Sequence, residues 1–451
     1  MKPKFIIAAF LIFPALSFAQ LSLNYQRFSL PNGLTVILHE DHSVPIISVN
    51  IWYHVGSGRE KPGRTGFAHL FEHIMFEGSG HVAKGKFDEW LEAAGGDNNG
   101  STTSDRTNYF EDIPSNALEL PLFLESDRMG FLLDAMSPAK VDAQRDVVKN
   151  ERRQSYENRP YGLAFIKIEE SLFPPDHPYH WPTIGYMDDL TAASYEDVVD
   201  FFKKYYSTAN SSLVIAGDID PVKTKSLVEK WFRDVPSGKP VPPVAPPAAF
   251  LGEEKKLVME DKVQLPRLYL AWLTPPQLTP GDAELDVLAN ILAGGKNSRL
   301  YKRLVYDLQI AQDVSAFQES RQLKSEFLVV ATARAGHTLS ELAGVIQDEI
   351  NRVKAVPPSS REVQRAVNQF EASFLDRLEN IGGKADQLNN YFTGTGNPDY
   401  FNEDLARYKA LSPGDIQSVA QTYLRDDGRV ILSVVPEGKK ELAVPEQKEG
   451  K

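Results

Sequence analysis

The chain of 451 residues contains no cysteine. This absence excludes disulfide bonds and thiolate metal ligands. A chain of this length can bury a core large enough to be stable without cross-links, and its length is typical of two to four domains.

Basic residues are in deficit: 49 Lys and Arg stand against 61 Asp and Glu, which gives a formal net charge of -12. A diffuse acidic balance of this kind repels polyanions. It argues against nucleic acid or an anionic membrane surface as a partner.

Long hydrophobic runs are missing after the first twenty residues. At the start, two lysines precede an apolar run over 5–16, and small residues follow at Ser17 and Ala19. This order predicts a secretory signal peptide over residues 1–19. The run is short for a membrane span and is interrupted by Pro14. We therefore expect an exported protein, periplasmic or secreted, without a membrane span; an uncleaved N-terminal anchor is the alternative.

The most informative stretch that is present holds His69, Glu72 and His73 in the order H-x-x-E-H. On an α-helix, residues three and four apart lie on one face. Two imidazoles one turn apart can hold a zinc ion, and a carboxylate between them can reach a water bound to that ion. The alternative is a core helix with two incidental histidines, but the full pattern favours a metal.

Catalytic zinc usually takes three protein ligands, so a third must come from another element. Ser137 and the proline after it predict the start of a helix that runs to about residue 157. Glu151 lies on this helix, on the same face as Gln144. On spacing alone Glu151 is one candidate among several, with Glu77 and Glu92 as rivals.

His177 and His180 form a second possible metal pair. Their spacing inside a proline-rich loop does not suit two ligands on one helix face. We expect a packed loop instead.

Helical patterns alternate with short β-rich stretches along the whole chain, and the strand-then-helix order begins again after a segment with six prolines between 236 and 247. This predicts an α+β fold of two similar domains, each a largely antiparallel sheet with helices packed on one face. The helix expected over 115–133 should kink at Pro121. The expected segments are a zinc-bearing domain over 20–235, a proline-rich linker over 236–250, a second domain without a metal site over 251–440 and a loose tail over 441–451.

The two halves also resemble each other in sequence. When Ile74 is placed on Ile291, the apolar positions of the two helices superpose. In this alignment the second helix has Asp286 in place of His69, Ala289 in place of Glu72 and Asn290 in place of His73. This pattern indicates an internal duplication whose second copy has lost the metal site.

Three segments together resemble the pitrilysin, or insulinase-type, family of zinc metallopeptidases. They are His69–His73, Gly95–Thr102 and Asp146–Arg153. The half-length class of that family includes the subunits of the mitochondrial processing peptidases.

The resemblance implies His69, His73 and Glu151 as ligands of one zinc ion per chain, and Glu72 as general base. It implies a metalloendopeptidase that hydrolyses peptides or small unfolded proteins. One departure is Gln144, where many relatives carry a glutamate. Glutamine keeps the length and the hydrogen bonding of that side chain but not its charge.

The resemblance also implies that a substrate peptide adds as an extra strand beside the strand that contains Thr107. Asn99 would bond the peptide backbone, with Gly100 and Thr102 in the same substrate-binding segment. Two rival functions remain: a non-catalytic assembly protein of the same fold, and a zinc-binding module that has no use for Glu72.

Relatives enclose their substrate between two halves of this length, and the half opposite the zinc supplies an arginine and a tyrosine. Here the matching positions are Val305 and Gln312, unless Arg303 or Tyr306 takes the role. We therefore expect a heterodimer with a subunit of similar length that carries the pair; a homodimer is the alternative.

Overall fold

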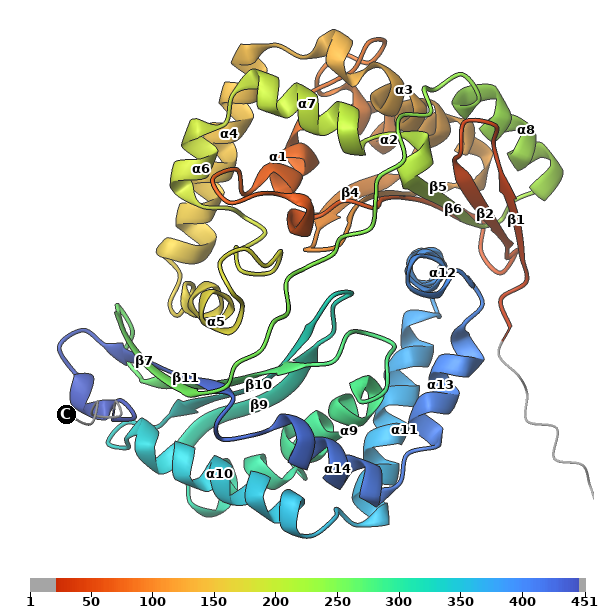
Figure 1. Cartoon of the computed structure of the whole chain (residues 1–451). Coiled ribbons are helices and arrows are strands. Elements are labelled where there is room, and N and C mark those ends of the chain that lie inside the picture. Colours follow the sequence, from red (N-terminus) through yellow and green to blue (C-terminus); the bar gives the residue numbers. More distant parts are fainter. Residues whose placement is uncertain (1–21, 446–451) are drawn as a thin grey trace, which may run out of the picture.

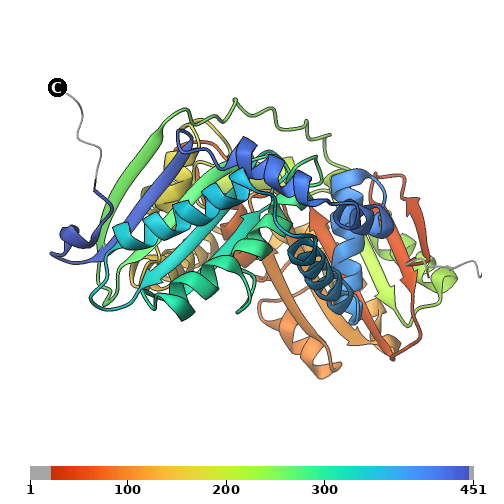
Figure 2. The ribbon, with the colours of Figure 1, turned by 90° about the horizontal axis from the view of Figure 1, so that it is seen from below.

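The computed structural model of the chain describes residues 22–445 (Figure 1). The expected signal peptide lies outside the described residues, as does the last part of the expected tail. The chain forms two halves, each with one β-sheet. An extended segment without helix or strand joins α8, which ends at Phe232, to β7, which begins at Glu254. Figure 2 shows this segment running along one side of the molecule.

The first sheet has six strands in the order β1-β2-β6-β3-β5-β4. Only β2 and β6 are parallel, and every other neighbouring pair is antiparallel. Its strands are β1 (Tyr25–Ser29), β2 (Thr35–Glu40), β3 (Ile46–Tyr53), β4 (Asp97–Thr102), β5 (Thr107–Pro114) and β6 (Ser211–Gly217).

The second sheet has five strands in the order β7-β11-β8-β10-β9, and only β7 and β11 are parallel. Its strands are β7 (Glu254–Asp261), β8 (Arg267–Thr274), β9 (Ala311–Glu319), β10 (Ser325–Ala333) and β11 (Arg429–Pro436). Without β1, the two sheets have the same strand order and the same directions in chain order. The predicted similarity of the two domains is therefore confirmed by topology, and their origin by internal duplication stays a prediction.

Helices make up the rest of each half. The first half contains α1 (Phe67–Ile74), α2 (Lys86–Ala93), α3 (Glu119–Ala135), α4 (Pro138–Arg152), α5 (Ala164–Leu172), α6 (Met187–Ala192), α7 (Tyr195–Tyr205) and α8 (Pro221–Phe232). The second half contains α9 (Asp282–Ala293), α10 (Leu339–Ala355), α11 (Ser360–Arg377), α12 (Ile381–Thr395), α13 (Phe401–Lys409) and α14 (Pro413–Tyr423). The predicted α+β class is confirmed.

The two halves exchange one helix each. Helix α12 of the second half packs on β3 and β6, and α5 of the first half packs on β8 and β11 (Figure 1). Val214 and Leu388 belong to one buried cluster, and Ile168 and Val430 to another. The prediction of helices on one face was therefore incomplete: helices of the same half cover one face of each sheet, and a helix of the other half packs on the opposite face.

Two local predictions were wrong. Helix α3 does not kink at Pro121, which lies in its first turn, where a proline costs no hydrogen bond. The backbone instead leaves helical geometry at Phe131, where φ is -130°. The expected tail also begins as packed structure, because Ala443 and Val444 are buried and the Val444 N–H donates to the Ser433 hydroxyl at 3.1 Å.

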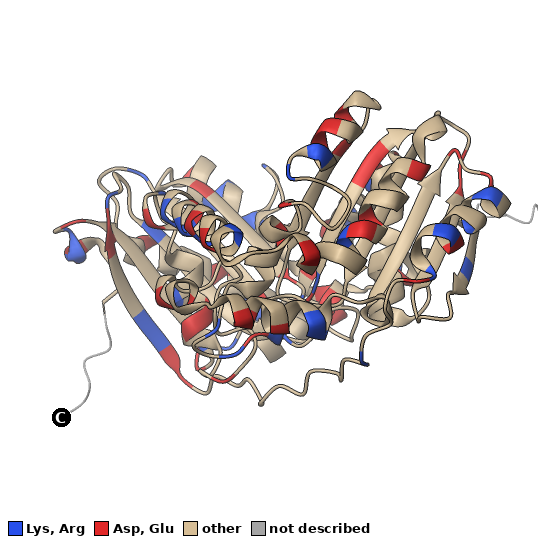
Figure 3. Cartoon of the chain, turned by 90° about the horizontal axis from the view of Figure 1, so that it is seen from above, with Lys and Arg blue, Asp and Glu red and all other residues tan. Residues whose placement is uncertain are grey.

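Charged residues of both signs are interspersed over both halves (Figure 3). Within residues 22–445, no helix combines the length and the apolar character needed to cross a membrane.

Candidate metal centre

Helix α1 carries the H-x-x-E-H residues, and its start is held by a buried carboxylate. Glu60 accepts hydrogen bonds from the backbone N–H of Gly66 at 2.9 Å and of Ala68 at 2.8 Å. Gly66 has φ of +86°, and a Cβ there would lie 2.8 Å from the carbonyl oxygen of Ile184. A side chain at this position would strain the backbone and crowd that oxygen, so glycine is strongly favoured directly before the helix.

The three predicted ligands meet where α1 packs on α4. The Nε2 atom of His73 lies 3.2 Å from Glu151 Oε2, and the Nε2 atom of His69 lies 3.7 Å from Glu151 Oε1. The ligand atoms all lie within 4.8 Å of one another. Among the described residues, this is the one group of three such side chains close enough to hold an ion.

The electrostatics of the group suit a divalent cation. Burial lowers the pKa of His69, which keeps its ring neutral at neutral pH and its Nε2 lone pair available. The hydrogen bond with His73 lowers the pKa of Glu151, so this carboxylate is ionised. Two imidazole nitrogens and one carboxylate oxygen are a donor set that zinc takes in peptidases. The residues present therefore fit a zinc ion.

Glu72 lies on α1 beside this group, and its side chain contacts β4. The Thr102 hydroxyl donates to Glu72 Oε2 at 2.5 Å. A Cβ added at Gly100 would lie 3.1 Å from Glu72 Cγ, so the small residue lets the carboxylate lie against the strand. Gly100 and Thr102 thus support Glu72, and their contact with a substrate stays a prediction.

The position predicted for a substrate strand was wrong in one respect. Strand β5, which contains Thr107, is hydrogen-bonded to β3 on one side and β4 on the other. The edge of the sheet on this side is β4, which contains Asn99, Gly100 and Thr102. An edge strand can pair with an added strand, and Asn99 is exposed there. The Asn99 side chain accepts a hydrogen bond from the Gly100 N–H at 2.8 Å.

The two faces of β4 differ. Asn98, Gly100 and Thr102 point to the side of α1 and α2, as shown by the 3.1 Å bond from Asn98 to Asp88. Ser101 points the other way and donates to Asn108 at 2.7 Å. Because side chains alternate along a strand, Asp97 and Asn99 share the face of Ser101.

The rival ligands do not join the metal group. Glu77 is buried and binds Lys84 Nζ at 2.7 Å and the side-chain amide of Gln144. The Gln144 side chain therefore donates to Glu77, a rival of the predicted ligand Glu151. Glu92 is exposed on α2.

The histidine pair in the proline-rich loop is packed, as expected. His177 Nδ1 accepts from the Tyr179 N–H at 3.1 Å, and burial lowers the pKa of His177 to about 4. His180 Nδ1 bonds the carbonyl oxygen of Phe173 at 2.8 Å.

A buried ionic cluster beneath α1 was not found from the sequence. Arg128 bonds Glu125 at 2.9 Å and Glu111 at 3.4 Å, and its guanidinium lies 4.2 Å from the centre of the Tyr109 ring. The Tyr109 hydroxyl donates to the carbonyl oxygen of Phe71 on α1. No sequence signal marked these residues, and Glu60 lies too far before its helix to read as a capping residue.

A cavity of about 730 Å³ lies between the two halves, beside Thr102, whose hydroxyl donates to Glu72. Thr102 and Trp52 line it from the first half, and Phe317 and Arg321 from the second. A peptide at the β4 edge would therefore lie between the halves.

The positions expected for an arginine and a tyrosine differ in their surroundings. Val305 packs against the core of the second half, and Gln312 is exposed on β9. Arg303 bonds Glu349 at 2.9 Å and contacts Asp348, so its charge is already paired. Tyr306 is 73% exposed.

The duplicated fold, with two imidazoles, a carboxylate and an adjacent glutamate at one edge of the first sheet, defines the class of the H-x-x-E-H zinc peptidases. The chain belongs to peptidase family M16. The sequence pattern described as "Insulinase (Peptidase family M16)" matches residues 35–170, and the one described as "Peptidase M16 inactive domain" matches residues 192–370.

Known proteins resemble the chain over most of its length. A protein named zinc protease PqqE from Helicobacter pylori is 28% identical over 424 residues, which cover 91% of this chain and 93% of that one. A probable β subunit of the mitochondrial-processing peptidase from Arabidopsis thaliana is 24% identical and matches 90% of this chain and 78% of that one. The crystal structure of a protease from Helicobacter pylori has a TM-score of 0.86 at 25% identity and covers 92% of this chain and 100% of that one.

Proposed function

We propose that this chain is an exported, zinc-dependent metalloendopeptidase that hydrolyses peptides or small unfolded proteins. The observation that carries the proposal is the position of Glu72, which is held by Thr102 beside a set of three zinc-type donors. The relatives named as zinc proteases support it. The pattern described as an inactive domain matches residues 192–370, which contain none of the three proposed ligands, and this agrees with a single metal site.

His69, His73 and Glu151 would hold the zinc ion, which when bound polarises a peptide carbonyl and makes a water molecule more acidic. Glu72 takes a proton from the attacking water and later returns it to the leaving amine. The Thr102 hydroxyl occupies Glu72 Oε2, which leaves Oε1 to accept that proton. The free edge of β4 holds the peptide backbone in extended form.

The decisive experiment replaces Glu72 with glutamine. The Glu72→Gln chain should fold and keep about one zinc per chain but lose at least about a thousandfold in turnover. His69→Ala should lose the metal itself. Near-normal turnover by Glu72→Gln would place the base elsewhere, and absence of peptidase activity in the zinc-loaded parent would favour a binding or assembly role.

We further propose that the working enzyme is a heterodimer with a subunit of similar length. Neither Val305 nor Gln312 can donate a hydrogen bond as an arginine and a tyrosine do, and Arg303 is paired with Glu349. Missing oxyanion donors cost about a hundredfold in rate. Full activity of the purified chain, unchanged by adding such a subunit, would contradict this; a homodimer is the alternative.

Export is the remaining part of the proposal. It predicts a mature chain that begins at Gln20. N-terminal sequencing of the protein from a periplasmic or secreted fraction tests this, and an intact residue 1 in the active protein would contradict it.

A further inference from the structure

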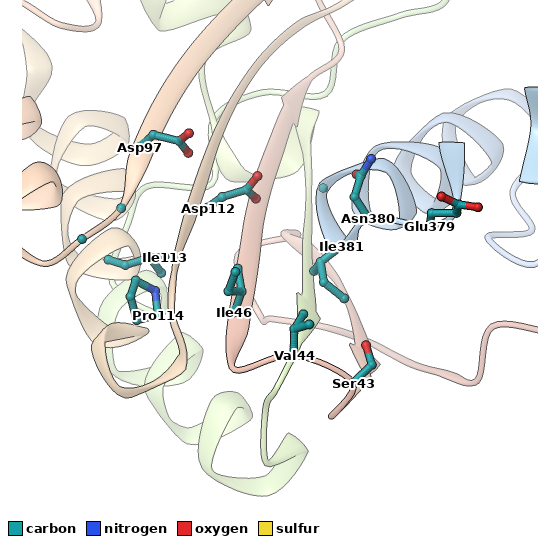
Figure 4. A pocket seen from close by; sticks show the side chains of 13 residues that line it. Ser43, Val44, Ile46, Asp97, Asp112, Ile113, Pro114, Glu379, Asn380 and Ile381 are labelled. Atoms are coloured by element: carbon teal, nitrogen blue, oxygen red, sulfur yellow. The ribbon is translucent and has the colours of Figure 1, made fainter. Parts of the chain in front are cut away.

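A cavity of about 600 Å³ lies where β4 begins, at the opposite end of that strand from Thr102 (Figure 4). Its walls come from three places. The first is the segment that leads into β3, the second is the start of β4 with the end of β5, and the third is the start of α12 from the other half.

The cavity lies beside the free edge that would hold a peptide. Asp97 of β4 and Asp112 of β5 are directly opposite each other in the sheet. A Cβ added at Gly382 of α12 would lie 3.2 Å from Asp112 Oδ2, so this carboxylate points to the α12 face. Strands rise about 3.3 Å per residue, so Asp97 lies about 10 Å along the strand from Gly100 and Glu72. A peptide paired with β4 would pass the cavity about three residues from the bond to be cleaved.

The charge of the cavity is unbalanced. Asp97, Asp112 and Glu379 line it, and none of its lining residues is a Lys, Arg or His. Two like charges directly opposite each other across neighbouring strands destabilise a sheet. Burial raises the pKa of Asp112, and a hydrogen bond from the Ser48 hydroxyl, opposite it on β3, offsets part of this effect. A cation placed here would relieve the repulsion between the two carboxylates and stabilise the charged form of Asp112.

The floor of the cavity is apolar. Val44 and Ile46 line it and are 42% and 41% exposed, which is high for large apolar side chains. Ile381 closes it from α12. An apolar floor with carboxylates above it complements a long side chain that has a methylene stem and a charged head.

We propose that this cavity is a specificity pocket that takes a lysine or arginine side chain of the bound peptide. The stem packs on Val44 and Ile46, and the cationic head binds Asp97 and Asp112. The pocket rests on the proposed function, because it requires a peptide on the β4 edge. It deepens that function by naming the class of substrate, which is basic peptides.

The test measures binding rather than turnover. It uses the zinc-loaded Glu72→Gln chain and fluorescent peptides in which lysine or the uncharged isostere norleucine is placed at successive positions. At low salt, lysine at one position should improve binding about tenfold over norleucine. The preference should weaken as salt is raised. In Asp97→Asn/Asp112→Asn on the same background, the ratio of the two affinities should fall to about one.

A matched variant removes two charges elsewhere. Asp307→Asn/Glu403→Gln changes two exposed carboxylates that do not line the cavity, and it should keep the tenfold ratio. If the Asp112 change prevents folding, the Asp97→Asn variant tests the proposal by itself. This variant should fold normally, because Asp97 is exposed. This single variant should lower the ratio about threefold.

Equal binding of both peptides at every position would overturn the proposal, as would a tenfold preference that survives in Asp97→Asn/Asp112→Asn. Failure of the proposed function looks different. In that case the parent chain with intact Glu72 hydrolyses no peptide, while the lysine preference in binding remains.

Discussion

The hydroxyl of Thr102 links the peptide-binding edge to the proposed base, since the residue lies on β4 and donates to Glu72 at 2.5 Å. At the scale of single residues, this hydrogen bond is the contact best suited to a test by substitution. Thr102→Val keeps the shape of the side chain and removes the donor. It should lower turnover about tenfold with zinc content unchanged, because Glu72 loses the group that orients it.

Thr102→Ser is the matched control, since it keeps the hydroxyl, and it should retain most of the activity. The measurements are the zinc content and the steady-state kinetics of the parent, Thr102→Val and Thr102→Ser. Equal turnover in Thr102→Val would mean that Glu72 is oriented without this bond.

At the scale of elements, the stability of α1 depends on one buried carboxylate. Glu60 satisfies two backbone donors at the start of the helix. Glu60→Ala leaves both unpaired and should lower the free energy of unfolding by about 2 kcal/mol. Urea denaturation of the zinc-free protein measures this without a contribution from metal binding. Glu92→Ala, at an exposed position on α2, should change stability by less than about 0.5 kcal/mol, and an equal loss in both variants would contradict the capping role.

The start of α11 should make stability depend on pH. The hydrogen bond from Arg299 lowers the pKa of Glu362 from 4.5 to about 2, with help from the Ser359 backbone N–H. Because the pKa is lower in the folded state, this carboxylate stabilises the fold above about pH 4.5, and the contribution disappears as the pH falls towards 2.

We therefore expect Glu362→Gln to be about 1–2 kcal/mol less stable than the parent at pH 7, and the difference to shrink towards pH 2. Urea titrations at several pH values measure it. Arg299→Gln should show the same pH dependence, and the double variant should cost little more than either one. A difference that does not depend on pH would contradict the ion pair as its source.

At the scale of the whole molecule, the exchanged helices join the halves into one folding unit. Asn389 of α12 is fully buried in the first half, where it donates to the carbonyl oxygen of Asn50 at 3.1 Å and accepts from the Ser212 hydroxyl. Neither half has its full core without a helix of the other.

We expect both halves to unfold in a single transition, and Asn389→Ala to lower the free energy of unfolding of both by about 2 kcal/mol. Hydrogen exchange of β3 and β8 in urea reports on each half separately. Asn158→Ala, at an exposed position, is the control. Loss of protection in β3 alone would show that the halves open independently.

The sequence by itself determined the features that depend on neighbours a few residues apart. The spacing of His69, Glu72 and His73 places them on one helix face, because a helix turns every 3.6 residues. The same local periodicity revealed the repeated strand and helix order, and hence the α+β class and the duplication. It did not find Glu60 or Arg128, whose partners are set by packing.

Only the tertiary structure decided which elements meet. By spacing alone Glu151 was one candidate among several, with Glu77 and Glu92 as rivals. The packing of α4 on α1 directs Glu151 to the histidines, while Glu77 is paired with Lys84. Strand order put β4 at an edge of the sheet, although the family resemblance implied a peptide beside β5. The exchange of α5 and α12, and the cavity that α12 closes, follow from contacts between residues hundreds of positions apart. Local periodicity carries no information about such contacts, because it reports on a single turn or strand at a time.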